Sequence, residues 1–171
     1  MRKLSMDELG RMSVADFKEA PKKSIVVVMD QIRSMHNVGS VFRTADAFLI
    51  NGICLCGFTP QPPHRDIHKT ALGATDSVDW VYYEQTIEAV NALKLQGYKV
   101  YAIEQTEGSI PLNQFKKEDQ AIAFVFGNEV DGVDQSVIDL CDGVIEIPQW
   151  GMKHSLNISV AAAVVLWEFV R

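Results

Sequence analysis

Short, unbroken apolar runs alternate along the chain with segments whose apolar residues have helical spacing. The first run, residues 25–29, is rich in β-branched side chains, which is typical of a strand covered on both faces in a parallel sheet. Strands are predicted at residues 25–29, 52–57, 78–83, 98–103, 121–126 and 144–147. Helices are predicted at residues 38–49, 86–95, 135–141 and 158–169, with a short helical piece ending at residues 71–74. This alternation predicts an α/β fold with a mostly parallel sheet, helices on both faces, and a ligand site at the carboxyl ends of the strands.

The last predicted helix is apolar on every side. One face carries Ile158, Ala161, Ala162, Val165, Leu166 and Phe169, and the opposite face carries Val160, Ala163, Val164 and Trp167. Ser155 or Asn157 is placed to cap this helix, because a short polar side chain accepts a hydrogen bond from a first-turn N–H group. The run is shorter than the roughly 20 apolar residues that a membrane span needs, so no membrane contact is expected. We expect one face to pack on the core and the other to form the interface of a homodimer.

The length of 171 residues is that of a single domain. Residues 1–22 are expected to be a polar, helical appendage, in which Ser13 and Asp16 have the spacing of a capping box, and residues 25–170 to be the core. The first twenty residues mix acids and bases without an apolar block, which fits neither a secretory signal nor a transit peptide. A cytoplasmic protein is therefore expected, and its three cysteines, an odd number, are expected to be reduced thiols.

The net charge of −6 argues against a polyanionic partner, but the charge is unevenly distributed. Residues 104–146 hold ten acids against only Lys116 and Lys117. Basic side chains and histidines occur in other segments: Arg33, Arg43, Arg65, Lys69 and Lys153, with His36, His64, His68 and His154. They form a basic face if those segments converge, with residues 64–69 as an RNA-facing loop, and otherwise they are ordinary surface charge.

A zinc site is the one metal site that the sequence suggests, and the spacing disfavours it. Cys54 and Cys56 are separated by one residue rather than the usual two to four, although His64 and His68 follow. Cysteines within a buried strand are ordinary core residues, so no metal is expected. Four aromatic residues are likewise interpreted as core rather than as base-stacking platforms: Phe58, Trp80, Tyr82 and Tyr83.

Three loops follow predicted strands and are expected to be neighbours at one edge of the sheet: residues 30–43, 127–132 and 148–157. The first contains Asn-Val-Gly-Ser-Val-Phe-Arg-Thr-Ala-Asp from residue 37, and the second contains Phe-Gly-Asn-Glu-Val-Asp-Gly from residue 126. The third contains Ile-Pro at 147–148 and Gly-Met-Lys-His-Ser-Leu-Asn-Ile-Ser from residue 151. In this order they resemble the three motifs of the SpoU, or TrmH, branch of the SPOUT RNA methyltransferases.

The resemblance implies a homodimeric α/β domain with a C-terminal trefoil knot, which binds S-adenosylmethionine and methylates a ribose 2'-hydroxyl of RNA. The family's catalytic residues carry over to Arg43, Asn37, Glu129, Ser155 and Asn157. Its cofactor contacts carry over to Gly127, Ile147 and Leu156, and more loosely to Ile103 and Glu104. The knot follows from the resemblance alone, since periodicity cannot predict one.

Each polar residue also has a simpler structural explanation. Arg43 is expected to clamp the target phosphate and stabilise charge, because an arginine stays protonated, and the alternative is a surface pair with Asp46. Glu129 is expected to hold Arg43 or the opposing loop, or else it is one more solvated acid. Asn37 is well placed as a helix cap, as are Ser155 and Asn157.

As the chain shows no extra RNA-recruiting domain before its core, a compact structured RNA is the expected substrate, tRNA first and rRNA second. Two other functions stay open. One is a dimeric RNA-binding protein that keeps the fold without methylating. The other is an α/β enzyme that acts on a free small molecule, whose activity would need no RNA and would be insensitive to salt.

Overall fold

The computed structural model describes residues 1–5, 7–117 and 119–171. Within them seven strands form one sheet in the order β3-β2-β1-β6-β4-β7-β5, and every described pair is parallel. The strands are β1 Lys23–Asp30, β2 Ile50–Cys56, β3 Trp80–Tyr83, β4 Lys99–Ile103, β5 Ile110–Pro111, β6 Ile122–Phe126 and β7 Gly143–Glu146. The predicted strands and the parallel α/β fold are confirmed; the two-residue edge strand β5 was not predicted.

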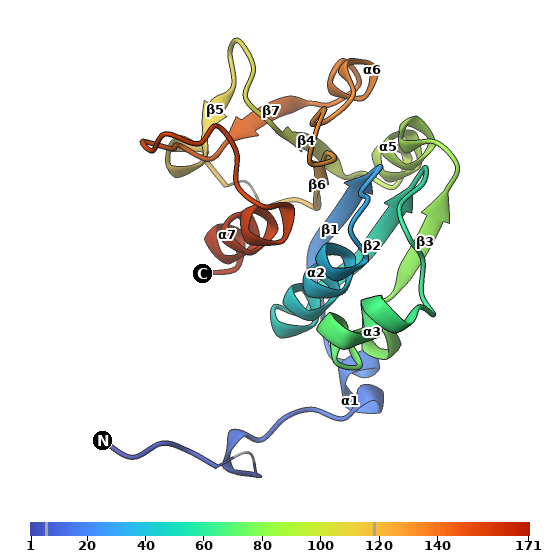
Figure 1. Ribbon diagram of the computed structural model, residues 1–171, viewed down its shortest axis with the longest axis vertical. Coiled ribbons are helices and arrows are strands. Elements are labelled where there is room, and N and C mark those ends of the chain that lie inside the picture. The colour runs from blue at the N-terminus through green and yellow to red at the C-terminus, as the bar shows by residue number, and fades with distance from the viewer. Residues whose placement is uncertain (6, 118) are drawn as a thin grey trace.

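Helices cover both faces of the sheet. They are α1 Val14–Glu19, α2 Met35–Ala47, α3 Arg65–Ala71, α4 Ala74–Ser77, α5 Thr86–Leu95, α6 Gln135–Ile138 and α7 Ile158–Val170, with 3-10 turns at Asp7–Leu9 and Leu112–Gln114. Alternate residues of β1 enter two separate apolar clusters. Val27 and Met29 pack with α2, α3, α4 and α7, whereas Val26 and Val28 pack with α5 and α6. Figure 1 shows α2 lying over β1 and β2, with α7 on one side of it and α3 on the other.

The N-terminal segment is only partly helical. Ser13 and Asp16 form the predicted capping box at the start of α1, but α1 has six residues and Phe17 is its one buried side chain. Apart from the 3-10 turn, the described residues before it have no regular structure, and their apolar side chains Leu4, Leu9 and Met12 are exposed rather than packed. Figure 1 shows this segment running away from the sheet. Residue 6 lies outside the described part of the chain.

Helix α7 shows the two faces that its sequence predicts. Ile158, Ala162, Val165 and Leu166 are buried, so the core-facing side is confirmed. On the other side Val160, Val164 and Trp167 are 48%, 38% and 57% exposed. Among the described residues no helix is long and apolar enough to cross a bilayer. Strand order alone does not determine how the chain threads, and both the trefoil knot and the homodimer stay predictions.

Candidate active site

The three motif loops meet at the carboxyl edge of the sheet. Strand β1 lies next to β6, β6 next to β4, and β4 next to β7, so the loops that leave these strands are neighbours. The first loop is short because Ser34 accepts a hydrogen bond from the Asn37 backbone N–H at 3.3 Å and starts α2 at Met35. The expectation that Asn37 caps this helix is therefore wrong. Asn37 instead lies inside the first turn, and its side chain is free to reach the other two loops.

Asn37 joins all three motifs through its side-chain amide. Its Nδ2 donates to Glu129 Oε1 at 2.8 Å, and its Oδ1 accepts from Asn157 Nδ2 at 3.2 Å. These partners are 92 and 120 residues away in the chain. Asn157 is also the N-cap of α7, because its Oδ1 accepts from the Ser159 backbone N–H at 2.9 Å. The predicted cap is thus confirmed for Asn157, which caps α7 and also donates a hydrogen bond to Asn37.

The loop that carries Glu129 is a tight turn. The backbone groups of Asn128 and Gly132 bond each other in both directions at 3.1 Å, and Asn128 Oδ1 accepts from the N–H groups of Val130 and Asp131 at 2.9 and 2.8 Å. A Cβ on Gly127 would stand 2.0 Å from the Gly132 carbonyl carbon. Only glycine fits there, and the fold of this loop depends on it.

Glu104 fastens the same turn to the end of β4. Its carboxylate accepts from the Val133 N–H at 3.2 Å and from the Gln105 N–H at 2.8 Å. Gln105 in turn donates from Nε2 to the His154 carbonyl at 2.8 Å, which connects this edge to the third motif. No motif pointed to Gln105 in the sequence; its place directly after a strand was the only available signal.

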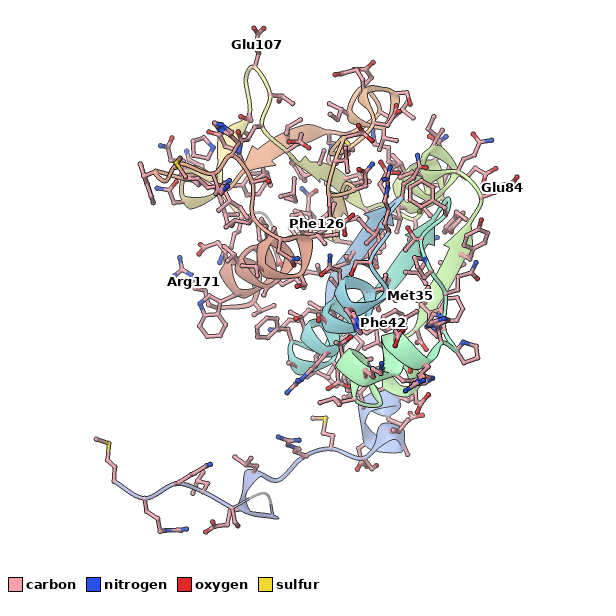
Figure 2. The ribbon with its side chains drawn as sticks, viewed as in Figure 1. Met35, Phe42, Glu84, Glu107, Phe126 and Arg171 are labelled. Atoms are coloured by element: carbon pink, nitrogen blue, oxygen red, sulfur yellow. The ribbon has the colours of Figure 1, made fainter. Side chains whose placement is uncertain are left out.

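These loops enclose a pocket of about 760 Å³, a size typical of small-molecule sites. Its lining includes most of the predicted site residues: Ile103, Glu104, Gly127, Glu129, Ile147, Ser155, Leu156 and Asn157. Figure 2 shows Phe126, another lining residue, where β6 ends beside α7, and Glu107 at the outer tip of the loop between β4 and β5. The pocket therefore combines apolar walls with a polar rim that is held by Asn37.

Arg43 lies outside this pocket. It follows Asn37 by six residues, which places it about 9 Å along the helix and about 240° around it. It lines a neighbouring groove of about 630 Å³, between α2, α3 and the exposed face of α7 that holds Val160, Val164 and Trp167. Within the described residues no carboxylate forms an ion pair with Arg43, and Asp46 instead accepts a hydrogen bond from the Ser77 hydroxyl. Glu129 holds the opposing segment through Asn37, not through Arg43.

The cysteines belong to the core. Cys54 and Cys56 are buried, and burial raises the pKa of the Cys54 thiol to about 12 and that of Cys56 further still. His64 Nδ1 accepts from the Asp66 N–H at 3.1 Å and caps α3. Across the described ranges no group of three or more histidine, cysteine or acidic side chains is arranged to hold a metal ion.

A sequence model of the SpoU rRNA Methylase family matches residues 24–167. The chain belongs to this family. That confirms the family to which the three motifs pointed. A Staphylococcus aureus (strain MSSA476) protein named for the TrmH family of tRNA/rRNA methyltransferases is 31% identical over 154 residues, which are 90% of this chain and 61% of the relative. This chain thus spans about three-fifths of the length of such curated relatives.

Solved structures share the fold. The SpoU methyltransferase AviRb from Streptomyces viridochromogenes, in complex with the cofactor AdoMet, superposes with a TM-score of 0.79 at 24% identity, over 91% of this chain and 60% of that one. A structure that concerns 2-OH methylation of C/U34 on tRNA gives a TM-score of 0.74 at 24% identity, over 84% of this chain and 92% of that one. At such identity these matches establish the SPOUT-type α/β fold of this member of the SpoU family.

Proposed function

We propose that this chain is an S-adenosylmethionine-dependent RNA methyltransferase that methylates a ribose 2'-hydroxyl, with tRNA preferred over rRNA. One observation carries the proposal: the side chain of Asn37 bonds Glu129 and Asn157, and so joins the three family motifs at the rim of one pocket. A merely structural contact would not need three polar side chains at the mouth of a cavity.

The pocket has the chemistry that this cofactor needs. Ile103, Ile147 and Leu156 offer apolar surface for an adenine ring, and Gly127 lets the backbone come close to it. Glu104 already holds the turn before Val133 through its carboxylate, so we assign it the shaping of this wall. When bound, S-adenosylmethionine supplies a methyl group that its sulfonium has already activated. The protein then has to place the ribose hydroxyl in line with that methyl group, and orientation can contribute roughly 7–11 kcal/mol to lowering a barrier.

The polar rim is assigned to the ribose. Asn37, Glu129, Ser155 and Asn157 would hold and orient the sugar, with its 2'-hydroxyl facing the methyl group that bound S-adenosylmethionine would supply. Arg43 clamps the adjoining phosphate and stabilises the developing negative charge, because a guanidinium stays protonated. Bidentate recognition of phosphate is what its planar group does best.

We assign Arg43 to the pocket of a second copy of the chain. Its groove is bordered by the apolar face of α7, where Val160, Val164 and Trp167 are exposed to solvent. An exposed apolar patch of this kind is typical of a protein–protein interface. We assign that surface to a homodimer packed through α7, in which Arg43 of one protomer completes the pocket of its partner. The preference for tRNA rests on the solved structure concerned with tRNA, of which this chain covers 92%.

The test is methyl transfer from labelled S-adenosylmethionine to bulk tRNA and to rRNA, followed by nuclease digestion and mass spectrometry of the nucleosides. We expect 2'-O-methyl nucleosides, and a loss of about 100-fold in rate for Asn157→Ala, because misplacing a reacting group by about 1 Å can cost that much. Asn91→Ala, in the exposed part of α5, is the matched control and should keep full rate. A methylated base in place of a methylated ribose would contradict the proposed reaction.

The same assay separates the alternatives. Tight RNA binding without turnover on any RNA would favour a non-catalytic RNA-binding dimer. Methylation of a free nucleoside, unaffected by salt, would favour an enzyme for small molecules.

A further inference from the structure

Phe58 is an exposed aromatic residue next to the active-site edge. It was expected in the core, yet its side chain is 53% exposed, directly after β2. The guanidinium carbon of Arg33 lies 5.8 Å from the centre of its ring, within cation–π range. Arg33 is itself exposed, and in the described part of the chain no acid forms an ion pair with it. The ring and the cation together form a flat surface that is open to solvent.

The two loops that carry this pair are rigidly joined below it. Thr59 is buried, and its hydroxyl accepts from the Ile32 N–H at 3.0 Å and donates to the Cys56 carbonyl at 2.7 Å, shared with the Met29 carbonyl at 3.0 Å. Thr59 therefore ties the loop after β1, which holds Arg33, to the loop after β2, which holds Phe58. A surface aromatic on so well-anchored a support is pre-organised for binding, since little entropy is lost when a ligand stacks on it.

The surroundings favour a polyanion. Residues 31–73 hold four lysines and arginines against two acids, a net of +2, whereas the rest of the chain holds twelve against twenty, a net of −8. Helix α3 packs on α2 through the Thr70 hydroxyl, which donates to the His36 carbonyl at 3.0 Å, and it presents Arg65, His68 and Lys69 to solvent. Phe58 thus lies in a stretch with an excess of positive charge, although the chain as a whole is acidic.

The pair is also at the right place relative to the site. Strand β2 lies two positions from β6 in the sheet, so the loops after them are about 10 Å apart. Arg33 precedes Asn37 by four residues in the same loop-to-helix junction. An RNA whose target ribose sits at Asn37 and Asn157 would pass a neighbouring nucleotide over Phe58.

We propose that Phe58 and Arg33 form a stacking platform for an unpaired base of the RNA, beside the nucleotide that is modified. The inference rests on the proposed function and sharpens it, because it assigns single-stranded or loop RNA as the form that is bound. Aromatic side chains stack on any unpaired base, and an arginine nearby attracts the phosphates and the base together.

The test compares a hairpin RNA with an unpaired loop and a fully paired duplex of equal length, by fluorescence anisotropy at fixed salt. Phe58→Ala should weaken hairpin binding by about 5- to 150-fold, the equivalent of about 1–3 kcal/mol for one stacked base, and should leave duplex binding unchanged. Phe58→Trp should preserve hairpin binding. Leu95→Ala, which removes an exposed apolar side chain from α5, is the matched control and should have no effect.

Arg33 is tested by salt dependence. Arg33→Ala should lower the slope of log affinity against log salt by about 1, whereas Phe58→Ala should leave that slope unchanged. Hairpin binding by Phe58→Ala within twofold of the wild type would overturn the platform, as would a loss of self-association in sedimentation, which would make Phe58 a contact between copies.

Binding of S-adenosylmethionine, measured by calorimetry, keeps the two ideas apart. If the wild type binds the cofactor and methylates RNA while Phe58→Ala changes nothing, only the platform fails. If the wild type does neither, the proposed function fails.

Discussion

The side chains at the start and near the end of α2 differ in how many partners they have within the chain. At its start, Asn37 is held by Glu129 and Asn157, and the pocket beside it is closed by bonds between residues far apart in the chain. Two turns later, Arg43 lines an open groove against the exposed side of α7. One chain thus builds the proposed cofactor pocket without help but leaves the arginine side open. Complementation, dimerisation and pH experiments can show whether a second copy completes it.

The largest expected effect comes from mixing two inactive variants. Arg43→Ala and Asn157→Ala should each lose about 100-fold in methyl transfer as pure proteins, because each removes a group that positions the ribose or its phosphate. Co-refolded, they should recover about a quarter of wild-type activity, since half of the dimers are mixed and each of those has one complete site. The measurement is initial rate against mixing ratio.

Absence of recovery would show that Arg43 serves the pocket of its own chain. The control for the effect of mixing itself is Arg11→Ala mixed with Asn157→Ala. Arg11 is exposed in the N-terminal segment and far in sequence from all three motifs, so its substitution should not affect either pocket.

A smaller effect is expected at the open side of α7. Trp167 is 57% exposed, and burying it in a dimer would make it an anchor of the interface. Trp167→Ala should weaken dimerisation by about 2 kcal/mol, roughly 30-fold in the dissociation constant. Sedimentation velocity over a range of concentrations measures this, with Trp150→Ala as the control for loss of an exposed tryptophan.

The smallest effect concerns Asp30, at the end of β1, which is hydrogen-bonded to α5 and to the loop before α6. This buried carboxylate accepts from the Thr86 hydroxyl and from the Asp134 N–H, and desolvation raises its pKa above the usual 3.8 despite those bonds. The folded state therefore binds the proton more tightly than the unfolded state. Its contribution to stability is full below pH 3.8 and falls as the pH rises through the raised pKa.

Denaturant titrations of wild type and Asp30→Asn between pH 3 and pH 7 test this sign. The wild type's advantage in free energy of unfolding should shrink as the pH rises through the raised pKa of Asp30. An advantage that grows with pH would mean that the hydrogen bonds outweigh desolvation.

The elements that the sequence predicted well are those with local causes. Helix α5 matches its predicted range residue for residue, because its apolar spacing and its end before Gly97 are both local signals. The start of α2 was placed three residues late, because Asn37 and Ser34 are both good caps and only the structure shows which one accepts the bond. Strand β5 has two residues and exists only through pairing with β7, so no local pattern marks it.

The residue pattern alone was enough to predict the α/β fold, the family, the three motifs and eight of the residues that line the pocket, because periodicity and motif order can be followed along the chain. The folded structure was needed to show that the Asn37 side chain joins the motifs, that Arg43 faces a separate groove, and that Phe58 is exposed beside Arg33. Which way a side chain points, and what meets it there, depends on contacts between residues far apart in the chain. No local pattern carries that information.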